Sequence, residues 1–400
     1  MAKPQIRLKG FEGEWENVCF KDFSYPAGEK NRDNLPLESY SISNEFGFVP
    51  QNEQFEKGGT MANADKRMYY IVKPDSFAYN PARINVGSIG YDNLDKDVIV
   101  SSLYVIFKTD SETNNEWLNI WFKTPYFKRL VELYQEGGVR LYFFYDKLCA
   151  CHLNRPLLLE QKAIADYFKS LDSMLQSTTK KIESLKQMKQ ACLVSMFPQV
   201  GETTPRVRFK GFDGKWEMKL LSNLLIERNE KYPKTLEFPL KAFIANIGVA
   251  DKGERYDRSA LINDVENKLY KRTYKGDFIY SSNNLETGSI GQNNHGNACI
   301  SPVYSIFFCT DIADSNFIGY RLTRKDFIKE MIKWRQGVMY GQWRIHEDDF
   351  LKISLLVPTK EEQELIGNYF RTLDKQISLE EQKLEKLKQI KAACLDKMFV

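Results

Sequence analysis

Hydrophobic and polar positions follow a helical pattern in two long stretches of the chain, 160–197 and 362–399. Apolar side chains recur there at alternating spacings of four and three residues, and Lys, Glu and Gln flank them. This spacing is the a/d seam of a heptad repeat, sustained over about five heptads. Neither stretch contains Pro, so each predicts one uninterrupted helix, about 57 Å long at a rise of roughly 1.5 Å per residue.

Most positions of both seams are apolar. The first seam comprises Ile164, Phe168, Leu171, Leu175, Thr178, Ile182, Leu185, Lys189, Cys192 and Met196. The second comprises Ile366, Phe370, Leu373, Ile377, Glu380, Leu384, Leu387, Lys391, Cys394 and Met398. Such a stripe is usually the core face of an ordinary helical domain, but this one recurs half a chain later. Because each seam needs a partner and the other copy is the nearest complementary surface, we expect the two helices to pair.

The residues around the helices are repeated as well. Positions 4–16 read PQIRLKGFEGEWE, and positions 205–217 read PRVRFKGFDGKWE. The sequence GSIG occurs at 87–90 and again at 288–291. The repeated unit is about half of the chain, which is too long for a solenoid repeat and suits a duplicated domain.

Each unit contains an opening motif, a globular stretch and a long helix, in that order. The predicted divisions are a first globular domain at 1–155, a long helix at 156–198, a linker at 199–204, a second globular domain at 205–357 and a long helix at 358–400. Thr359 and Glu362 have the spacing of a capping box at the start of the second helix. Because Phe197 leads into the second opening motif, the repeat predicts that Phe399 and Val400 lie near the first.

The globular stretches predict a mixed α/β (α+β) fold. The run at 97–107 predicts one buried strand, and the spacing over 117–134 predicts one helix that ends before Gly137. The second unit matches, with a strand near 300–309 and a helix near 315–335. Trp15 and Trp216 end the opening motifs, where a Trp more often fills a core than stacks on a base.

Composition limits the class of protein only loosely. The net charge of +4 permits nucleic-acid binding without indicating it, so such a surface would be local. No apolar run is long enough to span a membrane, and the seven cysteines lack a disulfide framework, so we expect a cytoplasmic protein. The Cys149-Ala150-Cys151-His152 segment lacks a second ligand pair, so it predicts a buried strand with small thiols and no metal site.

Enzyme signatures are missing from the sequence. There is no GxxxxGK[ST] phosphate-binding loop and no GxGxxG element. The three histidines, His152, His295 and His346, do not suggest a catalytic constellation that both halves share. We therefore expect the chain to have no catalytic residues of its own.

Two polar loops are the candidates for binding. Residues 79–91 read YNPARINVGSIGY, and 281–297 read SSNNLETGSIGQNNHGN. Asn and Gln can pair with adenine and Arg with guanine, and Gly and Ser let the backbone approach phosphates. Such segments are often only turns, but here they differ between the copies while the sequence around them repeats. The candidate DNA-binding residues are Asn80, Arg83, Asn85, Ser88, Arg140, Asn283, Asn284, Ser289, Gln292, Tyr340, Gln342 and Arg344.

These motifs together resemble those of a specificity subunit of a type I restriction–modification system. The resemblance covers nearly the whole chain and rests on the two RxKGFxGxWE motifs, on YNPARINVGSIG, and on GGVR at 137–140. The two helices that open with EQ and contain YF, LD, LKQ and MF complete it. The second unit departs from the pattern, with SSNNLETGSIG and GVMYGQWR, which suggests that the two units read different bases.

The resemblance implies two target recognition domains of mixed α/β structure. It also implies that the long helices form an antiparallel coiled coil between them, with pseudo-twofold symmetry. Such a subunit binds a bipartite double-stranded DNA target, and each domain reads one half-site. It docks two adenine-methyltransferase subunits and, with motor–endonuclease subunits, forms the restriction complex. The cofactors S-adenosylmethionine, ATP and Mg belong to those partners, and no membrane is involved.

Physical reasoning is consistent with this function. Two readers held by helices of about 57 Å would recognise a split site with an unread gap, at most roughly 17 base pairs at about 3.4 Å each. One alternative is a non-catalytic coiled-coil adaptor whose globular units bind protein. Another is an independent nuclease or methyltransferase, which the missing motifs disfavour.

Overall fold

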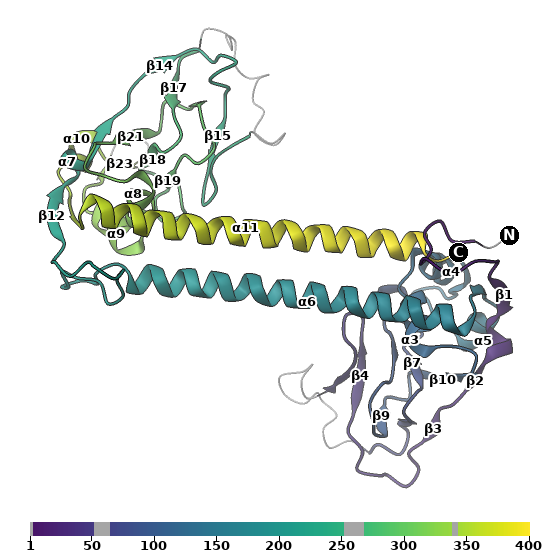
Figure 1. The fold of residues 1–400 in the computed structure, drawn as a ribbon. Coiled ribbons are helices and arrows are strands. Elements are labelled where there is room, and N and C mark those ends of the chain that lie inside the picture. The colour runs from purple at the N-terminus through teal and green to yellow at the C-terminus, as the bar shows by residue number, and fades with distance from the viewer. Residues whose placement is uncertain (1–2, 52–64, 252–267, 338–342) are drawn as a thin grey trace. The chain divides into compact units, whose positions relative to one another are not determined.

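The computed structural model describes residues 3–51, 65–251, 268–337 and 343–400 (Figure 1). The chain divides into two compact units, one of Met1–Thr179 with Gln382–Val400 and one of Lys180–Glu381. The two predicted long helices are present and continuous, as α6 (Leu158–Ser195) and α11 (Lys360–Lys397). Each of them contributes residues to both units.

The first unit combines small antiparallel sheets with short helices. Its elements before α6 are β1 (Glu16–Cys19), α1 (Phe20–Phe23), β2 (Ser24–Pro26), β3 (Glu29–Lys30), β4 (Tyr40–Ser43), β5 (Gly47–Pro50), β6 (Tyr70–Val72), β7 (Phe77–Tyr79), the 3₁₀ helix η1 (Ile84–Val86), β8 (Ile89–Tyr91), β9 (Val98–Val100), β10 (Val105–Thr109), α3 (Asn115–Trp121), α4 (Pro125–Tyr134), α5 (Tyr145–Cys149) and β11 (His152–Arg155). The largest sheet has the order β2-β10-β7-β8, and a second has the order β3-β6-β9. Strands β1 and β11 pair, as do β4 and β5. The mixed α/β character predicted from the sequence is confirmed.

The second unit repeats this order. Its elements before α11 are β12 (Glu217–Leu220), α7 (Leu221–Leu224), β13 (Leu225–Glu227), β14 (Lys231–Tyr232), β15 (Ala242–Ile244), β16 (Gly248–Ala250), β17 (Tyr270–Thr273), β18 (Phe278–Tyr280), β19 (Ile290–Gln292), β20 (Ala298–Ile300), β21 (Ser305–Cys309), α8 (Ser315–Leu322), α9 (Lys325–Ile332), β22 (Gln336–Gly337), β23 (Trp343–Arg344), α10 (Glu347–Leu351) and β24 (Ser354–Val357). Sheets β13-β21-β18-β19 and β14-β17-β20 match those of the first unit, and β12-β24, β15-β16 and β22-β23 are two-stranded.

The single strand predicted over 97–107 is wrong, because the run forms two strands in different sheets. Strand β9 belongs to the three-stranded sheet and β10 to the four-stranded sheet. A turn closed by the Tyr104 N–H on the Ser101 carbonyl oxygen separates them. Leu103 lies in this turn and is 70% exposed, so an apolar residue stands where a turn would ordinarily be polar. The predicted strand near 300–309 is divided in the same way, into β20 and β21.

The single helix predicted over 117–134 is also divided, into α3 and α4. Pro125 occupies the first turn of α4, and the Thr124 hydroxyl accepts the Phe127 N–H at 3.2 Å. Pro at this position starts a helix and cannot continue the preceding one. The helix predicted near 315–335 is likewise two helices, α8 and α9.

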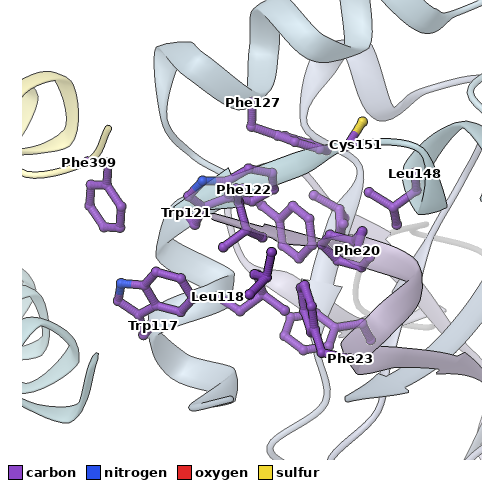
Figure 2. Packing of buried hydrophobic residues seen from close by; sticks show 14 of the residues in the cluster. Phe20, Phe23, Trp117, Leu118, Trp121, Phe122, Phe127, Leu148, Cys151 and Phe399 are labelled. Carbon is purple, nitrogen blue, oxygen red and sulfur yellow. The ribbon is translucent and has the colours of Figure 1, made fainter. Parts of the chain in front are cut away.

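Aromatic side chains fill the core of the first unit. Phe77 and Phe107 stack with ring centroids 5.1 Å apart, and Trp121 is buried in the same cluster. Figure 2 shows Phe399, from the end of the chain, pointing toward Trp117, with ring centroids 6.3 Å apart. In the second unit Phe197 packs in the same way against Phe317, at 5.6 Å.

Three predictions from the sequence concern the cores of the two units. Trp15 and Trp216 are both buried, as expected of residues that fill a core. The strand predicted through Cys149 and Cys151 is wrong, because Cys149 ends helix α5 and Cys151 precedes β11. Burial still holds for Cys151, which is 1% exposed.

The long helices run antiparallel within each unit. In the first unit the Tyr167 hydroxyl lies 3.6 Å from Cys394 Sγ, and Asp172, further along α6, pairs with Lys391. All predicted seam positions of both helices are buried or half-buried. The apolar face was therefore identified correctly from its spacing.

The second unit makes the equivalent contacts between the helices. Cys192 Sγ lies 3.4 Å from the Tyr369 hydroxyl, and Lys189 pairs with Asp374. The Tyr320 hydroxyl donates to the same Asp374 carboxylate at 2.6 Å. The polar seam position Lys189 is thus matched by a carboxylate.

Each opening motif is joined to the start of a long helix by a bidentate ion pair. Arg7 donates to both Glu160 oxygens at 2.8 Å, and Arg208 to both Glu362 oxygens at 2.7 Å. The predicted capping box of Thr359 with Glu362 is therefore wrong, because the Glu362 carboxylate faces the guanidinium. The Glu362 carboxylate instead fixes the second opening motif to the start of α11.

The end of the chain lies beside the first opening motif, as predicted. The Ile6 N–H donates to the Lys397 carbonyl oxygen at 3.0 Å, and Asn154 donates to the Val400 carbonyl oxygen at 3.0 Å. In Figure 1 the C mark lies beside the purple start of the ribbon. In the second unit the Val207 N–H donates to the Ser195 carbonyl oxygen at 2.9 Å.

Candidate nucleic-acid interface

The loop between β7 and β8 has a closely bonded backbone. The Asn80 N–H donates to the Ser88 carbonyl oxygen at 3.0 Å, and the Ser88 N–H donates to that of Arg83 at 3.1 Å. The Gly87 N–H closes η1 on the Ile84 carbonyl oxygen at 2.9 Å. This frame turns Arg83 and Asn85 outward, and both side chains are exposed.

The loop between β18 and β19 has the same frame. The Ser281 N–H donates to the Ser289 carbonyl oxygen at 2.8 Å, and the Ser289 N–H donates to that of Asn284 at 2.9 Å. Asn284 stands where the first loop has Arg83, and Glu286 stands where it has Asn85. The two loops therefore present different exposed side chains on one shared backbone design.

In the first unit a tight hairpin lies against this loop. Glu136 and Tyr142 exchange backbone hydrogen bonds of 2.8 Å, and the Phe143 N–H donates to the Pro81 carbonyl oxygen at 3.0 Å. Gly137 has a φ of 136°, and a Cβ there would lie 2.1 Å from the Arg140 carbonyl oxygen, so the turn requires Gly. The hairpin brings exposed Arg140 to the same region as the loop.

The second unit fastens its hairpin with side chains. Asn283 Oδ1 accepts the Trp343 N–H at 2.6 Å, and Ser282 Oγ accepts the Ile345 N–H at 3.0 Å. Arg335, just before β22, donates to both Glu286 carboxylate oxygens at 2.7 Å. Loop and hairpin therefore form one surface in this unit as well.

Exposure sorts the predicted residues into groups. Exposed side chains belong to Arg83, Asn85, Arg140, Asn283, Asn284 and Arg344. Asn80 and Gln292 are half-buried, and Ser88 and Ser289 are buried. Tyr340 and Gln342 lie outside the described residues.

Two predicted residues make hydrogen bonds within the protein. Ser88 Oγ donates to the Ile42 carbonyl oxygen at 2.9 Å, and Asn80 Oδ1 accepts the Ala82 N–H at 3.0 Å. Both contacts hold the loop in its shape. These side chains shape the loop, so the exposed residues are better placed to touch DNA.

The exposed arginines of the first unit are open to a partner. In the described part of the chain, neither Arg83 nor Arg140 has an acidic partner. Arg344 in the second unit lies 3.8 Å from the Glu347 carboxylate and is half exposed. Free guanidinium groups suit phosphate oxygens or the O6 and N7 of guanine.

Two exposed apolar residues near the loops, Phe46 and Ile247, were missed, and Trp343 of the second hairpin is exposed as well. Phe46 (73% exposed) and Ile247 (71%) lie in the turns after β4 and β15, and Trp343 is 49% exposed. The turn before Ile247 touches the second loop, where Asn246 Nδ2 donates to the Thr287 carbonyl oxygen at 3.2 Å. The signal was present in the sequence as an Asn followed shortly by Gly in both halves, NEFG and NIG.

The described residues offer no other chemical site of a familiar kind. Within 3–51, 65–251, 268–337 and 343–400, no group of three His, Cys, Asp or Glu side chains is placed to hold a metal ion. Over the same ranges, every helix is too short or too polar to cross a bilayer. The candidate site is the surface of exposed loops and hairpins described above.

Comparison with known proteins gives one family match. Residues 214–389 match the family described as type I restriction modification DNA specificity domain. No curated protein sequence matches the chain.

Two solved structures share the fold. One is the HsdS subunit from Thermoanaerobacter tengcongensis, with 15% identity, a TM-score of 0.51 and coverage of 96% of both chains. The other is the type I restriction–modification S subunit from M. genitalium, with 13% identity, a TM-score of 0.58 and coverage of 100% of this chain and 99% of that one.

These findings relate the chain to a restriction-system family over residues 214–389 and, in fold, over nearly its whole length. Residues 214–389 are similar to a type I restriction modification DNA specificity domain. The resemblance of the chain to the specificity subunits of these systems, drawn from its motifs, is confirmed.

Proposed function

We propose that the chain is the subunit that selects the DNA target of a type I restriction–modification complex. Each globular stretch reads one half of a split site, and the paired helices α6 and α11 form an antiparallel coiled coil whose length sets the gap. The chain supplies no catalytic group, and its role is to bring other subunits to the target.

The observation that carries this proposal is the shared loop frame with different exposed residues. The same backbone hydrogen bonds present Arg83 and Asn85 in one unit, and Asn284 and Glu286 in the other. Readers of two different sequences on one scaffold need this combination.

The partners follow from the same role. We propose that two methyltransferase subunits and motor–endonuclease subunits bind the chain, and that they use S-adenosylmethionine, ATP and Mg. A chain that only binds DNA needs such partners to modify or cut it. Double-stranded DNA is the partner of the exposed loops.

A mobility-shift selection tests the function. The chain, alone and with its methyltransferase partners, is incubated with a pool of random duplexes, and the retained duplexes are sequenced. We expect enrichment of two short sequences separated by an unread gap of constant length. If the folded chain enriches no sequence in either mixture, or binds only the methyltransferase subunits, it is a protein-binding adaptor.

A further inference from the structure

The second unit carries an exposed carboxylate on its loop that the sequence did not single out. Glu286 is 52% exposed on its side chain, whereas its partner Arg335 is 9% exposed. Both guanidinium nitrogens Nη1 and Nη2 bond the carboxylate at 2.7 Å. A bidentate pair of this kind fixes the carboxylate plane, and the remaining lone pairs are left for a donor from outside.

The charge of this group limits what it can meet on DNA. The hydrogen bonds from Arg335 lower the pKa of Glu286, so its carboxylate is ionised at neutral pH. An ionised carboxylate is repelled by phosphates and accepts hydrogen bonds only. In the major groove the donors on base edges are the amino groups of cytosine N4 and adenine N6.

We propose that Glu286, oriented by Arg335, reads one base of the half-site bound by the second unit. It accepts a hydrogen bond from the exocyclic amino group of a cytosine or an adenine. Glu286 is then a specificity-determining residue, and Arg335 is its positioning residue. This inference rests on the proposed function, because it needs the loop to face DNA.

The repeat shows that the pair is particular to the second unit. Asn85 occupies the position of Glu286 in the first loop, and Gln135 occupies that of Arg335. An amide both donates and accepts, so Asn85 does not restrict the base to one that carries a donor. The two half-sites should therefore differ in how strictly this position is read.

The variant E286A tests the inference in the full chain with its methyltransferase partners. Selection from random duplexes should show that preference at one position of one half-site falls by between roughly fivefold and 150-fold, the discrimination given by one good base contact. All other positions should keep their preference. Because E286A leaves the Arg335 guanidinium, 9% exposed, without its carboxylate partner, the denaturant midpoint of the variant is measured beside the selection.

Two matched variants locate the effect. N85A, at the aligned position of the first unit, should leave that base unchanged and act on the other half-site. E202A removes a partly exposed carboxylate outside the loops, which accepts hydrogen bonds from Arg206 and from the Gln199 N–H, both at 3.1 Å, and should change no preference. R335K keeps the charge but loses the planar fork, so it should weaken the same preference that E286A removes.

Several results would overturn the inference. For E286A, these are an unchanged preference at every position, a uniform loss of binding to all sequences, or a change in the half-site that N85A alters. For R335K, the contradicting result is an unchanged preference at the base that E286A affects. Failure of the proposed function is a separate result, because the wild-type chain would then enrich no split sequence at all.

Discussion

Two buried residues occupy equivalent positions in the two units but differ in charge, because one is an aspartate and the other an asparagine. Asp92 follows β8 and Asn293 follows β19, and both are fully buried. Asn293 accepts the His295 N–H at 2.9 Å and donates to Thr273 Oγ1 at 3.1 Å. Asp92 accepts the Leu94 N–H at 3.0 Å, but its second oxygen is buried without a partner among the described residues.

The substitution D92N should stabilise the first unit at neutral pH. Burial raises the pKa of Asp92 from 3.8 to about 6. The folded state therefore holds this proton more tightly, and stability falls as the pH rises from about 4 to about 6. Removing the ionisation should raise the free energy of unfolding at pH 7 by up to about 3 kcal/mol, and by much less at pH 4.

Denaturant unfolding of D92N at pH 4 and at pH 7 measures this gain in the free energy of unfolding. N293D, the reciprocal change in the second unit, should destabilise at pH 7. A gain in D92N that is equal at pH 4 and pH 7 would mean that packing, not ionisation, is responsible.

The exposed arginines of the first unit should matter for one half-site only. Alanine at Arg83 or Arg140 should weaken binding or relax one base by roughly 1–3 kcal/mol where the contact is bidentate. Arg32, exposed in the same unit outside loop and hairpin, provides the control R32A. Methylation that is unchanged at both half-sites in R83A and R140A would show that these arginines do not read DNA.

At the scale of elements, buried glutamines hold the helix starts. Gln161 Oε1 accepts the Asn114 N–H at 2.7 Å, while its Nε2 donates to the Glu112 and Pro156 carbonyl oxygens. Gln363 makes the equivalent contacts at the start of α11. Each glutamine therefore ties the loop before the short helix α3 or α8 to the start of the long helix.

Truncation of this glutamine should be costly. Q161A leaves a buried N–H and two carbonyl oxygens without their partner, so we expect a loss of roughly 2–4 kcal/mol in the free energy of unfolding. Q176A makes the same chemical change at an exposed position of the same helix and should cost little. Denaturant titrations that give equal midpoints for Q161A and Q176A would contradict the proposed role.

The sequence predicted elements well where their periodicity was long and poorly where an apolar run crossed a turn. The seams of α6 and α11 repeat for many residues, so their buried face could be read directly. The turn at 101–104 is hidden by Leu103, and the break before Pro125 is hidden by aromatic residues on both sides. The few polar residues at these breaks, Ser101 and Ser102 in one and Lys123 and Thr124 in the other, were too short an interruption for periodicity to separate the elements.

The candidate site was predicted in part. Sequence differences between the repeats located both loops, including exposed Arg83 and Asn284. They could not show that Ser88 faces inward, since this depends on the Ile42 carbonyl oxygen in a distant strand. The Glu286–Arg335 pair also joins positions far apart in the chain, so only the folded structure reveals it.

At the scale of the whole molecule, the proposed division of labour predicts that helix length sets the gap. One heptad added after Lys181 and another after Lys383 keeps the seam in register. It adds roughly 10 Å of helix, equivalent to about three base pairs at most, at roughly 3.4 Å each. Methylation mapping of this variant should show a longer gap between unchanged half-sites, with weaker binding because DNA rotates with each added pair. A changed half-site with an unchanged gap would falsify this division.

The central claim is that this chain selects a split DNA target for its partners. Methylated-base mapping of a genome in cells that carry the chain and its partner subunits tests it most directly. We predict one methylated motif made of two short sequences with an unread gap, which disappears when this chain alone is deleted. A continuous motif, or one that persists without the chain, would contradict the account.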